Sequence, residues 1–357
     1  MKKISKKFLY VLLIIIIETV VIKAFMYDVL PKKYFYDSNH ILNVMRGIGS
    51  ADKVYKHTAN IFNKINFLKL KNIKQWGYAV SAAFTTILII IFYKRRRMSK
   101  QESIFVFSCI ALLNIYVFGL TKDVIQFVYF LLLYIIINNK KLGTYSKLIL
   151  SCIVLLYEAI NFRVYYAIMA MLLVTIFFIY KFMIRGKTLN KKKIFKIIVI
   201  AILCFFAEVF VVQLLSKENY YSILYARSSV NSVRDDDVDA VTIINDLLGK
   251  NTNYFKFMAN YCINFIRMLI PVELLLKGVK YIPFIIFQIY IGYQLFKLSR
   301  KMNDNKVLWF SAVLSFEMVS VIFEPDFGSF IRHESALILI LLKIIEFNEE
   351  EKVKEKE

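Results

Sequence analysis

Long apolar runs, separated by short polar and basic segments, dominate this chain. Runs such as Val11–Ile17 and Leu131–Ile137 are apolar on every face and lack the alternation of a barrel strand. A helix of about 20 apolar residues crosses the hydrocarbon core of a bilayer, which is about 30 Å thick. Because lipid offers the backbone no hydrogen bonds, such runs must be helical. The pattern therefore predicts an all-α, polytopic membrane protein.

About ten of these runs have the composition of a membrane span. They are Phe8–Met26, Trp76–Tyr93, Ser103–Leu120, Val124–Ile137, Leu148–Glu158, Val164–Met183, Ile197–Leu215, Ile282–Leu298, Val307–Phe323 and Leu337–Phe347. One more apolar run, Phe257–Leu276, contains Arg267, Pro271 and Glu273, which are costly or disruptive in a lipid-facing helix. We expect that run to be a re-entrant or interfacial segment on the outer side.

Basic clusters indicate the orientation of the spans. Lys94–Arg97 and Arg185–Lys196 are the strongest, and placing them in the cytoplasm satisfies the positive-inside rule at every short loop. Both termini are then cytoplasmic. Residues 1–347 form one integral-membrane domain, and residues 348–357 form a charged cytoplasmic tail. The outer loops are expected near residues 27–75, 216–256 and 324–333.

The amino-acid composition limits the classes of function that this chain can have. The chain is 59% hydrophobic and has 48 Lys and Arg against 26 Asp and Glu, a net charge of +22. The basic residues lie in short clusters between apolar runs, which favours topology determinants over a nucleic-acid-binding surface. The four cysteines lie in apolar stretches without metal-ligand spacing. No metal, cofactor or nucleic-acid partner is therefore predicted.

With this topology, polar residues that flank apolar runs gather at the outer face. They are Asp37, His40, Lys122, Asp123, Glu158, Arg163, the Arg227–Asp239 loop, Arg267 and the residues from Glu324 to His333. A scatter of solvated loop charges is the alternative. Arg163, Arg267, Glu324 and Arg332 argue against it, because they sit where burial within the helix bundle is expected.

The last outer loop is the most informative of these segments. It presents the carboxylates of Glu324 and Asp326, followed by Arg332 and His333 near the start of the final helix. Free N–H groups at a helix N-terminus, together with an arginine fork, suit a phosphate or diphosphate. The alternative is a salt-bridged loop that closes two helices.

Two other groups of acidic residues leave the choice of function open. The run Asp235–Asp239 offers hard oxygen ligands, but it has no calcium-loop pattern and Arg234 adjoins it, so a solvated acidic patch is favoured. Glu18, Glu208 and Glu317 lie inside spans, where carboxyl groups mark either inter-helix hydrogen bonds or a polar pathway.

Four motifs resemble the EpsG/Wzy-like polysaccharide polymerases of bacterial exopolysaccharide and capsule clusters. They are Tyr36-Asp37-Ser38, Phe162-Arg163-Val164-Tyr165-Tyr166, the run from Arg267 to Glu273, and the run from Glu324 to Glu334. Together with the span pattern, the resemblance covers most of the chain. The large loop with its aspartate run has no counterpart in the family's pattern.

The resemblance implies chemistry at the extracytoplasmic face of the cytoplasmic membrane. Such proteins join oligosaccharide repeat units carried on undecaprenyl diphosphate, in membrane lipid and beside flippase and chain-length regulator proteins. The reaction needs a carboxylate to accept a proton and cations to stabilise the departing diphosphate. Candidate catalytic residues are Glu324, Asp326, Asp37 and His333, and candidate diphosphate ligands are Arg163, Arg267 and Arg332.

Three alternatives remain open at this point. A membrane glycosyltransferase or ligase would use the same lipid-linked donor and the same arginines. A flippase or transporter would require a polar pathway on both membrane sides, and it would favour internal pseudo-symmetry. A membrane scaffold would leave Arg163, Arg267 and Arg332 individually replaceable.

Overall fold

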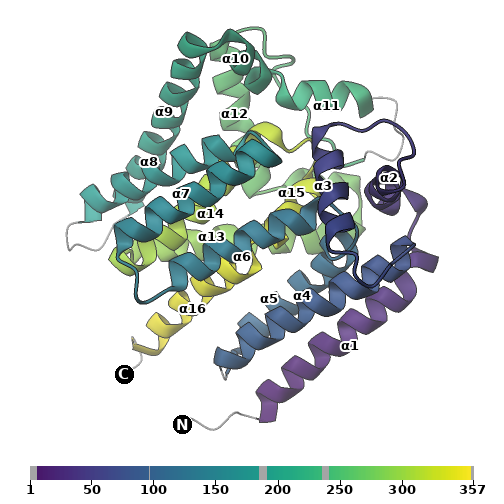
Figure 1. The fold of residues 1–357 in the computed structure, drawn as a ribbon. Helices are drawn as coiled ribbons and strands as arrows, with labels where there is room; N and C mark the ends of the chain where they lie inside the picture. Colours follow the sequence, from purple (N-terminus) through teal and green to yellow (C-terminus); the bar gives the residue numbers. More distant parts are fainter. Residues whose placement is uncertain (1–5, 96, 185–190, 235–240, 355–357) are drawn as a thin grey trace. The chain divides into compact units, whose positions relative to one another are not determined.

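Every regular element in the described part of the chain is a helix (Figure 1). The computed structural model describes residues 6–95, 97–184, 191–234 and 241–354. Within these residues, seven helices are long and apolar enough to cross a membrane. They are Lys6–Val29, Ile73–Arg95, Lys100–Val117, Tyr166–Met183, Phe195–Leu214, Val279–Arg300 and Asp304–Phe323. The all-α, polytopic prediction is confirmed, whereas the count of ten spans and the cytoplasmic termini stay predictions.

Three predicted spans fall in helices outside these seven. α6 (Asp123–Asn138) has 16 residues, α7 (Thr144–Asn161) has 18 and α16 (Ile338–Lys354) has 17. A perpendicular span needs about 20 residues. The second half of α16 is rich in glutamate and lysine, so its apolar part is shorter still.

The acidic run Asp235–Asp239 lies outside the described residues.

The chain divides into two compact units. Unit 1 comprises Met1–Leu132, Ile160–Arg163 and Arg332–Leu342. Unit 2 comprises Leu133–Ala159, Val164–Ile331 and Lys343–Glu357. The division into one membrane domain and a tail stays a prediction.

Unit 1 is built on three apolar helices, α1 (Lys6–Val29), α4 (Ile73–Arg95) and α5 (Lys100–Leu112). α1 packs against both α4 and α5. A capping box fixes the start of α5: the Ser99 hydroxyl accepts from the Glu102 N–H, and the Glu102 carboxylate accepts from the Ser99 N–H. Local sequence therefore determines where this helix begins.

The first polar segment of unit 1 folds into a helical hairpin. η1 (Lys32–Phe35) leads into α2 (Tyr36–Met45), which packs beside α3 (Lys53–Lys64) (Figure 1). The Asp52 side chain accepts a hydrogen bond from the Tyr55 N–H at 2.9 Å and caps α3. The hairpin carries the first predicted site residue, Asp37, in the first turn of α2.

A buried lysine stabilises the end of α5. The chain leaves α5 through the π-helical segment η2 (Leu113–Val117), and the last carbonyls of a helix lack backbone donors. Lys23 of α1 is 2% exposed and donates to the backbone oxygens of Asn114 and Phe118. Ser81 donates to the same Phe118 oxygen at 3.1 Å. These bonds hold the turn that leads into α6.

In unit 2, α14 (Asp304–Phe323) is the central helix. α8 (Tyr166–Ile184), α12 (Tyr254–Leu269) and α13 (Ile282–Arg300) pack against it (Figure 1). Almost all of α14 is buried, which accounts for its apolar pattern on every face. This unit also contains α9 (Lys191–Leu215), α10 (Lys217–Leu224), α11 (Ala226–Arg234), most of α7, and parts of α6, α15 (Phe327–Ser335) and α16.

The run predicted to be re-entrant, Phe257–Leu276, is not one continuous helix. α12 ends at Leu269, and Pro271 precedes the 3₁₀ helix η3 (Val272–Lys277). Proline lacks a backbone N–H and clashes with the preceding turn, so the α-helix stops there. The run is not among the seven long apolar helices, and its re-entrant or interfacial placement stays a prediction.

Cysteine accessibility tests the predicted orientation. Ser50 and Lys141 are both exposed, and they lie in a predicted outer and a predicted inner loop, respectively. With the four native cysteines replaced by alanine, Ser50→Cys should react with a membrane-impermeant maleimide on intact cells. Lys141→Cys should react only after permeabilisation. The reverse labelling pattern would show that the orientation is wrong.

Candidate functional site

A buried group of opposite charges lies in unit 1, the Asp123 cluster: Asp123, Gln126, Arg163, Arg332 and His333. Asp123 begins α6 and Gln126 follows one turn later, whereas Arg163 comes just after α7 and the last two residues lie in α15. The Asp123 side chain is only 2% exposed. Three segments far apart in the sequence therefore supply one site.

All three basic side chains of the cluster contact the Asp123 carboxylate. Arg163 Nη2 lies 2.7 Å from Oδ1, Arg332 Nε lies 3.3 Å from Oδ2, and His333 Nε2 lies 3.2 Å from Oδ1. Arg163 Nη1 also donates to the Gln126 side-chain oxygen at 2.7 Å. Both oxygens of Asp123 therefore contact basic groups, and the Arg163 guanidinium contacts both Asp123 and Gln126.

The Asp123 cluster brings two guanidinium groups and an imidazole to one carboxylate. Burial alone would raise the pKa of Asp123, but Arg332, His333 and Arg163 outweigh it and hold that pKa well below its usual range. Asp123 therefore stays ionised. Two guanidinium groups held together in this way suit an anionic ligand.

A second group in unit 1, the Asp37 cluster, consists of Asp37, Tyr55 and Lys122. The Tyr55 hydroxyl donates to Asp37 Oδ1, and Lys122 Nζ lies 3.2 Å from that hydroxyl and 3.5 Å from Asp37 Oδ2. Burial and the Asp37 charge raise the pKa of Tyr55, so its hydroxyl keeps its proton. Lys122 and Asp123 are adjacent in the chain, so the two clusters meet at one dipeptide.

The other predicted carboxylates, Glu324 and Asp326, lie in unit 2. Asp326 Oδ1 accepts from the Ser329 N–H at 2.7 Å, as a cap does at the start of a helix. Glu324 is buried, and its Oε2 accepts from the Ser329 hydroxyl at 2.8 Å. Asp326 also forms an isolated antiparallel bridge with Ile243. These contacts order the loop between α14 and α15, and a catalytic role for either carboxylate stays a prediction.

Arg267 also lies in unit 2, where it holds a loop. Its Nε and Nη2 form a bidentate pair with the Glu273 carboxylate at 2.7 and 2.8 Å. Its Nη1 donates to the Asn245 backbone oxygen and the Asn264 side-chain oxygen, both at 2.7 Å. Because these bonds occupy four of its five N–H groups, Arg267 has little capacity left for a ligand in this conformation. Its predicted role at the diphosphate stays a prediction.

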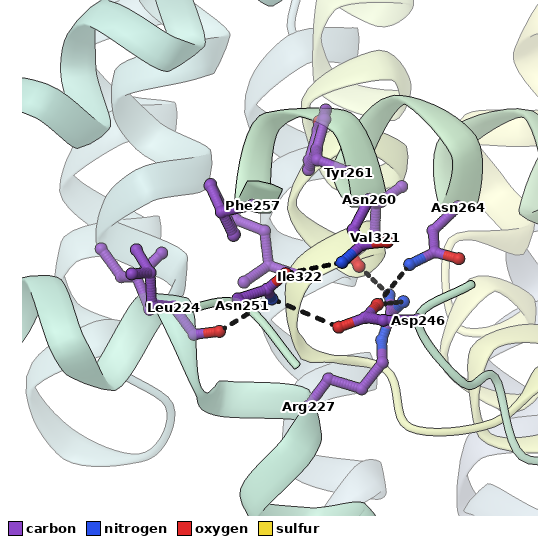
Figure 2. Close-up of a pocket in the computed structure, with 11 residues that line it drawn as sticks. Leu224, Arg227, Asp246, Asn251, Phe257, Asn260, Tyr261, Asn264, Val321 and Ile322 are labelled. Carbon is purple, nitrogen blue, oxygen red and sulfur yellow. Dashed lines mark hydrogen bonds and ion pairs between the residues drawn. The ribbon is translucent and has the colours of Figure 1, made fainter. Parts of the chain in front are cut away.

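A small polar pocket in unit 2 surrounds Arg227 and Asp246 (Figure 2). Arg227 donates to the Val321 backbone oxygen and lies 3.5 Å from Asp246 Oδ1. Asn264 and Asn251 donate to the same carboxylate at 2.6 and 3.2 Å. Burial lowers the pKa of Arg227 to about 10, which leaves it charged at neutral pH. The cavity of about 20 Å³ has room for about one water molecule, so this network orders the loop and does not enclose a substrate.

The structure joins three of the predicted site residues, Arg163, Arg332 and His333, in one cluster, and it places Asp37 in the same unit. In the sequence, Asp123 is one of many predicted outer charges, although in the structure it is the common partner of the three basic side chains. Asp123 directly precedes an apolar run, as Arg163 does, and this position was the sign in the sequence that both side chains are largely buried.

Comparisons of this chain with protein-family models, with curated proteins and with solved structures find no match. Function must therefore be argued from the chemistry of the two clusters in unit 1.

Proposed function

We propose that this protein polymerises oligosaccharide repeat units carried on undecaprenyl diphosphate into capsular polysaccharide or exopolysaccharide. The reaction would take place at the outer face of the cytoplasmic membrane. The observation that carries the proposal is the convergence of Arg163, Arg332 and His333 on Asp123 in a chain whose described residues include seven long apolar helices. A largely buried site with two arginines in a membrane protein suits the anionic head of a lipid-linked substrate.

The Asp123 cluster has the properties that a departing diphosphate requires. A guanidinium fork matches the geometry of phosphate oxygens, and each arginine has five N–H donors. Asp123 contacts both Arg163 and Arg332 and orients both groups before a substrate arrives. Charge that is positioned in advance stabilises a developing negative charge most effectively, because it needs no reorganisation during the reaction.

The proposed step is a glycosyl transfer. The oxygen of an acceptor hydroxyl forms a bond to the anomeric carbon of the lipid-linked donor. The bond between that carbon and the diphosphate oxygen breaks, and its electron pair leaves with the lipid diphosphate. The hydroxyl proton passes to a carboxylate. Asp37 is our choice for this base because it is 25% exposed and shares unit 1 with the arginines, while Glu324 and Asp326 stay alternatives.

Deletion of the gene tests the proposed function. Cells without the protein should lose long polymer and accumulate single repeat units on undecaprenyl diphosphate, and a plasmid copy should restore the polymer. Gel analysis of the polysaccharide and mass spectrometry of extracted lipids measure both effects. Normal polymer in the deletion strain would overturn the proposal.

The same lipid extracts separate the alternatives. A ligase mutant would still make full-length polymer but fail to transfer it to its final acceptor. A flippase mutant would keep its single repeat units on the inner leaflet, where a glycosidase added to intact cells cannot reach them. A polymerase mutant exposes these units to that glycosidase.

A further inference from the structure

We infer that the Asp37 cluster, together with the rings of Tyr36 and His40, is the subsite that holds the acceptor sugar. This inference rests on the proposed function and assigns the other half of the reaction. The Asp123 cluster suits the diphosphate of the donor, but a sugar has no charge for it to recognise. A sugar instead offers hydroxyl groups and apolar C–H faces.

The exposed ring of Tyr36 and the half-buried ring of His40 are linked to the Asp37 cluster by ring contacts. Tyr36, the neighbour of Asp37 in the chain, is 69% exposed. Its ring is parallel to that of His40 within 5°, with the ring centroids 6.2 Å apart. His40 in turn meets the Tyr55 ring edge-on at 4.4 Å. An exposed tyrosine offers a flat apolar face with a polar end, which suits the C–H face of a pyranose ring.

The polar groups of the cluster complement sugar hydroxyls, which both donate and accept hydrogen bonds. Asp37 is an acceptor, Lys122 is a donor and the Tyr55 hydroxyl can serve as either. The side chains of Asp37 and Lys122 are 25% and 24% exposed, so a ligand can reach both. Asp123, at 2% exposed, is far less accessible. The carboxylate of the Asp37 cluster, unlike that of the Asp123 cluster, is therefore open to a glycan.

α3 connects this subsite to the donor site. Tyr55 of α3 contacts Asp37, and two residues later the ring of His57 meets the Phe162 ring edge-on at 4.9 Å. Phe162 directly precedes Arg163 in the chain. A sugar held at Asp37 would thus lie in the unit that holds the diphosphate ligands, with the base at its hydroxyl.

The competing explanation is an aromatic belt at the membrane–water interface, where tyrosines are common. Tyr34 provides the matched control. It lies two residues from Tyr36, is 39% exposed and stacks on Tyr116, with the ring centroids 5.7 Å apart. A belt would depend on Tyr34 and Tyr36 alike, whereas a sugar subsite would depend on Tyr36 alone.

The test measures binding to the purified full-length protein in lipid nanodiscs by calorimetry. One probe is the oligosaccharide that mild acid releases from the cell's own polymer, and the other is undecaprenyl diphosphate. Tyr36→Ala and Tyr55→Phe should weaken oligosaccharide binding at least tenfold, and Tyr34→Ala should change it less than twofold. All three variants should bind undecaprenyl diphosphate like the wild type. Because Tyr36 is exposed and Tyr55→Phe removes only a hydroxyl, we expect both variants to fold.

The remaining outcomes show whether the acceptor subsite or the proposed function is wrong. Undiminished oligosaccharide binding in Tyr36→Ala and Tyr55→Phe, equal losses in Tyr34→Ala and Tyr36→Ala, or no binding by the wild type would each reject the acceptor subsite. These results leave the proposed function standing as long as undecaprenyl diphosphate binds and the deletion strain lacks polymer. Normal polymer in the deletion strain rejects the proposed function itself, and a wild-type protein that does not bind undecaprenyl diphosphate rejects its lipid-linked substrate.

Discussion

Cells in which Arg163→Ala or Arg332→Ala replaces the wild-type protein should lose polymer while protein levels stay near normal. If the arginines stabilise the departing diphosphate, each removal should slow transfer about 10²–10³-fold, as removal of one preorganised donor does elsewhere. Folding should survive because the two arginines share Asp123, so each single variant leaves that buried carboxylate with a cationic partner. Polymer on gels and protein level by immunoblot measure the two effects.

Two kinds of variant control this experiment. Arg163→Lys and Arg332→Lys keep the charge but lose the planar fork, so they should recover only part of the activity. Arg46 is an arginine of the same unit whose guanidinium donates to the Lys71 backbone oxygen at an exposed site. Arg46→Ala should leave polymer unchanged. Full-length polymer from both alanine variants of the cluster would remove these arginines from the proposed site.

Arg227→Ala should cause the largest loss of stability. The Arg227 side chain is 6% exposed, and it bonds the backbone oxygens of Val321 and Glu324 and pairs with Asp246. Its removal leaves Asp246 buried with only amide partners, and breaking a buried pair in this way costs about 3–5 kcal/mol. At about 2–4 °C per kcal/mol, the smaller cost lowers the unfolding midpoint by roughly 6–12 °C. The detergent-purified protein is heated to a series of temperatures, and size-exclusion chromatography then measures the fraction that remains folded at each temperature.

A second substitution shows whether charge or packing is responsible. Asp246→Asn removes the unpaired carboxylate, so the double variant Arg227→Ala with Asp246→Asn should unfold at a higher temperature than Arg227→Ala alone. Arg300 lies at the exposed end of α13, and Arg300→Ala should change stability by less than about 0.5 kcal/mol. An unchanged midpoint in Arg227→Ala would mean that this network does not stabilise the fold.

Local sequence was sufficient for the class of the fold and for several helix ends. Apolar runs predicted membrane helices, and Pro271 marked the end of α12. The capping box of Ser99 and Glu102 fixes the start of α5. These features depend on neighbouring residues and on lipid, so a single sequence displays them.

Local sequence was not sufficient to predict which residues pair with the charged side chains. Arg163, Arg267 and Arg332 look alike as arginines beside apolar runs, and all three were predicted to bind diphosphate. In the structure, Arg163 and Arg332 share Asp123 in unit 1, whereas Arg267 pairs with Glu273 in unit 2. Asp123 lies 40 residues before Arg163 and 210 residues before His333, the neighbour of Arg332, whereas Glu273 lies only six residues after Arg267.

The pattern of apolar and polar positions along the chain by itself determined that this is a helical membrane protein, because the transfer of apolar surface out of water depends mainly on composition along one helix. Tertiary structure alone decided which polar residues meet. Asp123 became the centre of the candidate site because a buried carboxylate is stable only where cations surround it, and those cations come from distant segments of the chain.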